Sequence, residues 1–143
     1  MHDRMAHLES ARIALRASFG LVPLLAGLDK FTYLLVDWSA YVAPIARSLL
    51  PVDPHTFLDV VGLVEVLVGL AVLTRWTVLG SYIAAGWLTV IAVNLTLAGF
   101  FDIAVRDLVL AIAAFTLARL TEVHDAAATR LEEPRDERAS RAA

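Results

Sequence analysis

The sequence contains no cysteine among its 143 residues. This absence excludes disulfide bonds, thiol relays and thiolate metal sites, whichever compartment the loops face. Charged residues are also scarce, at 19% of the chain, and the formal net charge is −3, with the basic residues mostly near the two ends. A nucleic-acid-binding protein needs a basic face, so we expect no nucleic-acid partner.

Histidine is absent from the apolar part of the chain. The only four histidines are His2, His7, His55 and His124, which all lie outside the long apolar segments. A membrane haem needs axial ligands within its spans, so a buried bis-histidine haem is excluded. The chain has no Gly-rich phosphate loop, no H-E-x-x-H motif and no recognisable Ser-His-Asp arrangement. A carboxylate pair without histidine is a weak metal signal, and we expect no metal site.

Apolar residues, by contrast, make up 59% of the chain, and its mean hydropathy is +0.69. These values are higher than is usual for a water-soluble domain of this length. Four apolar segments are long enough to cross a hydrocarbon core of about 30 Å, and backbone in lipid must pair within each segment, which favours helices. The sequence therefore predicts an all-α, integral membrane four-helix bundle with spans at about 13–36, 56–73, 76–100 and 102–120.

The arginines outside the spans predict the orientation. Arg47 lies on one side of the predicted bundle, and eight arginines lie on the other: Arg4, Arg12, Arg75, Arg119, Arg130, Arg135, Arg138 and Arg141. Basic loops favour the cytoplasm, so we expect the segment 1–12 and the tail 121–143 inside the cell, and the loop 37–55 outside. The charged tail should be a frayed helix end near His124 followed by flexible, solvated chain. The chain would be a multi-pass protein of the inner membrane.

A helical rise of about 1.5 Å per residue converts the position of a residue in a span into its depth in the bilayer. Six polar residues then lie at a similar depth. They are Asp29, Lys30, Glu65, Asn94, Arg106 and Asp107. All six fall in the outer half of the bilayer, whereas Arg16 falls in the inner half, where it can snorkel to the cytoplasm. Charged groups in a membrane are costly, so they pair or mark a functional site. We expect a buried cluster that can hold a small polar headgroup.

Helical spacing supports burial of three of these groups on faces of small residues. The faces are Arg16, Gly20, Pro23, Gly27 and Lys30; Gly62, Glu65 and Gly69; and Asp107, Ala111, Ala114 and Ala118. Among the six polar residues, the three carboxylates exceed the two basic side chains by one negative charge. Glu65 is expected to hold a proton, because it is the carboxylate furthest from its own interface.

Structural interpretations also remain open for each member of the cluster. In chain order they are an interfacial position for Asp29, snorkelling for Lys30, interhelical hydrogen bonds for Glu65 and Asn94, and a helix-end ion pair for Arg106 and Asp107.

Three sequence blocks resemble the DoxX family of small four-helix membrane proteins. They are GLDKF at 27–31, GLVEVLVGLAVLTR at 62–75 and RDLVLAIAAFTLARL at 106–120. The resemblance covers about residues 12–120, and its most specific part is the second block, in which a glutamate between glycines leads to a short Thr-Arg turn. Many members carry a histidine near the end of the third helix, where this chain reads NLTLAGFF.

The family takes its name from a subunit of an archaeal thiosulfate:quinone oxidoreductase. The resemblance implies a non-autonomous membrane subunit that handles quinone beside a redox partner protein. Quinone binding would fall to Asp29, Lys30, Asn94 and Arg106, and proton relay to Glu65 and Asp107. Two other functions remain open, a non-catalytic accessory subunit of a larger membrane complex and a pathway for protons or a small solute.

Overall fold

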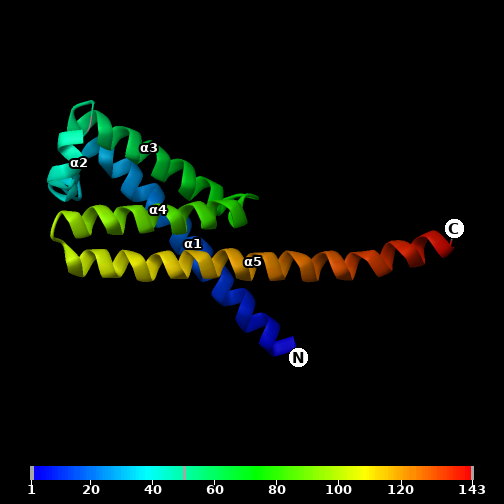
Figure 1. Cartoon of the computed structure of the whole chain (residues 1–143). Coiled ribbons are helices and arrows are strands. Elements are labelled where there is room, and N and C mark those ends of the chain that lie inside the picture. Colours follow the sequence, from blue (N-terminus) through cyan, green and yellow to red (C-terminus); the bar gives the residue numbers. More distant parts are fainter. Residues whose placement is uncertain (1, 50, 143) are drawn as a thin grey trace.

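The chain is helical throughout the part that the structure, a computed structural model, describes (Figure 1). This part comprises residues 2–49 and 51–142, with the side chains of residues 6–49 and 51–129, and it contains no strand. The elements are α1 (His2–Thr32), the 3-10 helix η1 (Trp38–Tyr41), α2 (Pro44–Leu49), α3 (Pro54–Leu73), α4 (Thr77–Leu97) and α5 (Phe101–Ala142). The predicted all-α class is confirmed.

Three helices are long and apolar enough to cross a membrane: α1 over Ala6–Thr32, α3 over its whole length, and α4 over its whole length. The fourth predicted span, the first half of α5, is not among them. It carries Asp102, Arg106, Asp107 and Arg119, and charged residues weaken the tendency to enter lipid.

The first helix ends earlier than predicted, at Thr32 instead of residue 36. Tyr33 adopts a left-handed conformation, with φ of 52°, and this turns the chain out of the helix. The carboxylate of Asp29 accepts hydrogen bonds from the N–H groups of Leu34 at 3.0 Å and Leu35 at 2.9 Å. These bonds replace the helical partners that the segment 33–36 lacks.

Helix α3 begins at a side-chain cap that the sequence supplies. Asp53 accepts from the Thr56 hydroxyl at 2.6 Å and from the Thr56 and His55 N–H groups at 3.1 and 3.0 Å, and Pro54 follows it. These bonds hold the pKa of the Asp53 carboxyl below its ordinary value, and the bond from the Thr56 hydroxyl has the largest effect. The cap is therefore present at neutral pH, and it is lost only as the pH falls through that lowered pKa.

Helix α5 continues beyond the predicted end of the membrane part. The sequence predicts fraying near His124 and a flexible tail over 121–143, whereas α5 continues to Ala142 and extends past the other helices (Figure 1). The segment 126–142 is rich in alanine, glutamate and arginine, which are strong helix formers and explain the continuation. The side chains of Arg4 and of the four arginines from 130 to 141, used in predicting the orientation, lie outside the described part.

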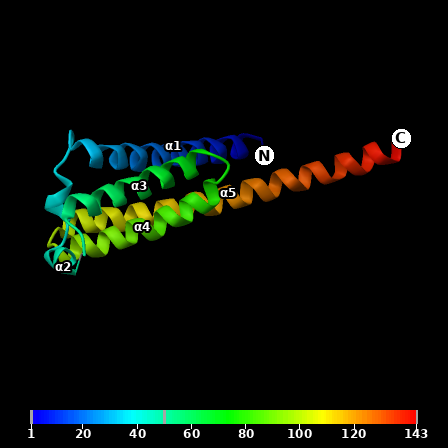
Figure 2. The ribbon, with the colours of Figure 1, turned by 90° about the horizontal axis from the view of Figure 1, so that it is seen from above.

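The long helices pack as two pairs, α1 along α3 and α4 along α5, with α3 also against α4 (Figure 2). The first pair is in backbone contact. A Cβ atom added to Gly27 would lie 2.5 Å from the Gly62 carbonyl oxygen, and one added to Gly69 would lie 2.6 Å from the Gly20 carbonyl oxygen. The predicted small-residue faces of the first two spans therefore meet each other, as they do in closely packed membrane helices.

The face predicted for the fourth span is buried as well. Asp107, Ala111, Ala114 and Ala118 are all buried. The central apolar core joins four helices through Phe19, Val68, Val72, Ala84, Ala114 and Leu117. Many large apolar side chains instead face outward, including Leu21, Leu25, Leu63, Leu67, Val90, Val93, Ile112 and Phe115. Such an extensive apolar surface suits contact with lipid.

The two ends of the helices differ in character (Figure 2). We call the end that carries η1, α2 and the α4–α5 turn the loop end. The opposite end carries the short α3–α4 turn at residues 74–76, and we call it the turn end. The N-terminus and the distal half of α5 lie beyond the turn end.

Candidate functional site

A buried ion pair joins α1 to α3. The Nζ atom of Lys30 lies 2.5 Å from Oε2 of Glu65. The two residues are only 3% and 6% exposed, so the pair is withdrawn from solvent. Lys30 lies one turn after Gly27, and Glu65 one turn after Gly62, so the backbone contact of these glycines brings the two charges together. The structure thus unites two of the predicted site residues.

Trp38 covers the ion pair from the loop end. Its ring centroid lies 3.6 Å from the Lys30 ammonium, an arrangement in which the aromatic face attracts the cation. Its indole N–H donates to Oδ2 of Asp29 at 2.8 Å, which fixes the ring. The sequence analysis missed this residue as part of the site, because an aromatic in an outer loop gives no sign that it folds back onto a helix.

Trp87 of α4 lies beside the Glu65 member of the pair. Its buried indole N–H lies beside the Glu65 carboxylate and acts on it as a hydrogen-bond donor, although its geometry falls short of a complete hydrogen bond. The sequence held a signal for this position, since Gly80, Ala84 and Trp87 follow helical steps of four and three residues, and the first two are buried. A buried donor without a complete hydrogen bond is uncommon and calls for a partner.

Asp107 is the second buried carboxylate of this region. It is 5% exposed and lies close enough to act on Glu65 as a like charge. Its ion-pair partner is Arg106, whose NH2 atom lies 3.0 Å from Oδ1 of Asp107. Lys30, Glu65, Trp87 and Asp107 therefore form what we call the buried cluster.

Arg106 does not belong to the buried cluster, contrary to the prediction. Its side chain is 65% exposed and reaches Asp107 from outside. Neighbouring residues on an α-helix point about 100° apart, so the inward direction of Asp107 forces Arg106 outward. The open alternative of an ion pair near the end of the helix describes Arg106 better than a role in binding a headgroup.

Asp29 is engaged by its own turn and does not pair with Lys30. Both carboxylate oxygens are used, Oδ1 by the N–H groups of Leu34 and Leu35 and Oδ2 by Trp38. The predicted role of Asp29 in holding a cofactor therefore gives way to a structural one. The sequence shows only that Asp29 and Lys30 are adjacent and of opposite charge. It does not show that Asp29 binds the turn after α1 whereas Lys30 is buried against α3.

Asn94 fastens the loop end and is likewise removed from the ion pair. Its Nδ2 donates to the carbonyl of Tyr41 at 2.7 Å, and its Oδ1 accepts from the N–H of Ala43 at 3.0 Å. The amide thus replaces the pairing that these backbone groups lack between η1 and α2. In the structure Asn94 therefore holds the loop against α4, and its contact with a headgroup stays a prediction.

The chemistry available to the buried cluster is proton exchange and hydrogen bonding. An ammonium and a carboxylate at 2.5 Å make a charge-assisted hydrogen bond through which a proton can pass. The indole N–H of Trp87 adds a donor beside the Glu65 carboxylate that an incoming oxygen atom can share. Among the described residues, no group of three or more His, Asp and Glu side chains is placed to hold a metal ion.

Comparisons of this chain with protein-family models, with curated proteins and with solved structures give no match.

Proposed function

We propose that this chain is a DoxX-like subunit of a redox complex in the inner membrane. In this proposal α1, α3, α4 and the first half of α5 are the four spans, and both termini are cytoplasmic. The apolar outer faces of the helices support it, as do the basic residues at or beyond the ends of the proposed spans, which are Arg12, Arg75 and Arg119 at the turn end and Arg47 at the loop end. The DoxX-like blocks at 27–31, 62–75 and 106–120 supply the link to redox complexes.

The buried cluster would receive a quinone headgroup or a similar small polar molecule. The observation that carries this proposal is a buried ion pair with the N–H of Trp87 beside its carboxylate, where the N–H makes no complete hydrogen bond. An unpaired buried donor costs about 1–3 kcal/mol, part of which an oxygen atom of a bound headgroup would recover. Lys30 would donate to a quinone oxygen as well.

Reduction of a quinone to a quinol takes up two electrons and two protons. In the proposed reaction a redox partner protein supplies the two electrons, and the two protons come from water, each relayed through Asp107 and Glu65, which return to their starting state after each transfer. Lys30 stabilises the negative charge that develops on the quinone oxygen. Trp38 is the side chain that a headgroup arriving from the loop end would meet first.

A second function, that of a non-catalytic accessory subunit, is favoured by a different observation. Lys30 and Glu65 neutralise each other without a ligand, and buried pairs of this kind can serve to fix one packing arrangement. The substitution Glu65→Gln separates the two functions. If abundance and complex formation stay normal while quinone-dependent turnover in membranes is lost, the binding function holds. If only assembly falls, the accessory function holds.

The substitution Trp87→Phe should weaken quinone binding about five- to tenfold, because it removes one hydrogen bond worth about 1–1.4 kcal/mol and keeps the aromatic ring. The measurement is the affinity of the purified protein in mild detergent for a short-chain ubiquinone. Trp76→Phe is the matched control, since Trp76 is 52% exposed at the turn end. Equal affinities of wild type and Trp87→Phe, or equal losses in the two variants, would contradict the proposed contact.

A further inference from the structure

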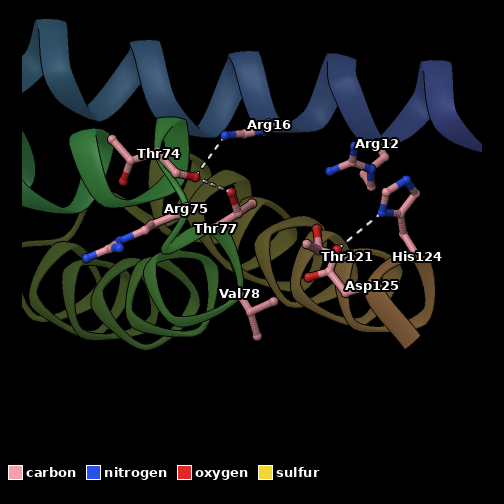
Figure 3. A pocket seen from close by; sticks show the side chains of 9 residues that line it. All are labelled: Arg12, Arg16, Thr74, Arg75, Thr77, Val78, Thr121, His124 and Asp125. Atoms are coloured by element: carbon pink, nitrogen blue, oxygen red, sulfur yellow. Dashed lines mark hydrogen bonds and ion pairs between the residues drawn. The ribbon is translucent and has the colours of Figure 1, made fainter. Parts of the chain in front are cut away.

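A second polar site lies at the turn end of the helices (Figure 3). It is a pocket of about 250 Å³ between α1, the α3–α4 turn and α5. Arg12 and Arg16 of α1, Arg75 of the turn, and His124 and Asp125 of α5 line it together with threonines. The pocket is separate from the buried cluster, none of whose members lines it.

Arg16 is built into the wall of this pocket. It donates to the carbonyl oxygens of Val72, Leu73 and Thr74 at 3.1, 2.7 and 2.8 Å, which are carbonyls that the end of α3 leaves without helical partners. The sequence analysis expected this side chain to snorkel to the cytoplasm, whereas it is anchored to the neighbouring helix. No carboxylate pairs with it among the described side chains, so its charge acts on the pocket.

Arg75 is the guanidinium with capacity to bind a ligand. Within the described part of the chain it makes no hydrogen bond and no ion pair, and its one recorded aromatic contact is with Trp76, whose ring centroid lies 5.7 Å away. Arg12, by contrast, is held by Glu9 at 2.6 Å. The side chain of Arg75 extends away from Arg12 and His124 (Figure 3), so it lies at the rim of the pocket, where an unpaired guanidinium offers a phosphate group several N–H donors in a planar fork.

The balance of charge around the pocket favours an anion. The guanidinium groups of Arg12, Arg16 and Arg75 exceed the carboxylates of Glu9 and Asp125 by one charge. His124 lies between these carboxylates, with Nε2 at 3.4 Å from Glu9 and Nδ1 at 3.2 Å from Asp125. A zwitterionic headgroup would bring an ammonium towards the same arginines and lose part of the attraction.

We propose that this pocket binds the phosphate group of an anionic phospholipid of the inner leaflet. The inference rests on the membrane placement given under the proposed function, but not on quinone binding. At that placement the turn end lies at the level of the lipid headgroups, where basic pockets between helices hold anionic lipids. The exposed side chains of Ile13, Trp76 and Leu79 provide apolar surface for the acyl chains at this end. Arg75 is the residue that confers the preference.

The test uses the full chain purified in mild nonionic detergent and native mass spectrometry of its lipid adducts. Phosphatidylglycerol, phosphatidylcholine with the same acyl chains, and inorganic phosphate are added separately and then in competition. We expect phosphatidylglycerol to bind preferentially, and Arg75→Gln to weaken it about fivefold, the effect of roughly 1 kcal/mol for one basic residue near lipid phosphate. Arg75→Lys should recover only part of the binding, because the ammonium keeps the charge but not the planar fork. Arg47→Gln, which removes one charge at the loop end, should leave it unchanged.

Three results would overturn the assignment. The first is equal retention of the two lipids by the wild-type protein. The second is the same loss of phosphatidylglycerol in Arg75→Gln and Arg47→Gln. The third is displacement of the lipid by inorganic phosphate at millimolar concentration, which would identify a site for free phosphate. Each leaves the quinone measurement unaffected, so failure of this inference is distinguishable from failure of the proposed function.

Discussion

Replacing Lys30 with methionine is expected to destabilise the protein by about 3–5 kcal/mol, because it leaves the Glu65 carboxylate buried without its partner. The ion pair is withdrawn from solvent on both sides, with exposures of 3% and 6%. Water therefore cannot take over the role of the lost ammonium. The destabilisation can be measured as a shift in reversible unfolding by a denaturing detergent titrated into mild-detergent micelles.

The double variant Lys30→Met/Glu65→Met is the decisive companion to this experiment. Replacing both members of a buried pair with apolar residues of similar volume is often neutral or stabilising. We therefore expect the double variant to recover most of the stability that the single variant loses. The cycle also needs the single variant Glu65→Met. If the double variant loses as much stability as Lys30→Met and Glu65→Met together, the two side chains do not interact, and the ion pair is contradicted.

Replacing Gly27 with leucine is expected to cost about 3 kcal/mol or more, at the upper end of the range for overpacked interiors. A Cβ atom at this position would already lie 2.5 Å from the Gly62 carbonyl oxygen and 2.9 Å from the backbone N of Val66. These neighbours are backbone atoms that cannot turn aside, so α1 and α3 must separate. The same separation moves Lys30 away from Glu65, so binding of a short-chain ubiquinone should fall with the stability.

Gly86→Ala is the matched control for this effect. A Cβ atom at Gly86 would meet nothing within 4 Å, although this glycine also lies inside an apolar helix. The change should be neutral, or should stabilise α4 by up to about 1 kcal/mol through its higher helix propensity. Similar losses of stability in both variants would show that glycine content, and not the contact between α1 and α3, explains the result.

The sequence was sufficient to predict the helical class and the contact at the centre of the site. Small residues at steps of three and four mark the face on which a helix can approach its neighbour. That rule placed Lys30 and Glu65 on facing sides of α1 and α3, because each lies one turn from a glycine of the contact. Helical spacing from Gly80 and Ala84 likewise predicts that Trp87 of α4 faces inward, although a single tryptophan gives no further sign of a functional role.

The predicted cluster differs from the observed one where the prediction used the depth of a residue in the bilayer and not the direction of its side chain. Arg106 and Asp107 lie at one depth, but their side chains point about 100° apart on α5, and only Asp107 faces the interior. Asp29 and Asn94 lie apart from the predicted cluster for another reason. Nearby backbone N–H groups without partners form hydrogen bonds with their side chains. These hydrogen bonds depend on how the chain leaves α1 and passes through η1, and helical periodicity carries no information on this.

The single lysine of the chain permits the most direct test of the central claim, that a buried Lys30–Glu65 pair is the core of a ligand-binding site. Labelling lysine with ¹⁵N at Nζ gives one side-chain ammonium signal in the full-length protein in detergent or lipid nanodiscs. We predict a signal with slow proton exchange that shifts in Glu65→Gln and again when a short-chain ubiquinone is added to the wild type. A rapidly exchanging signal, unchanged by Glu65→Gln and by the quinone, would contradict the account.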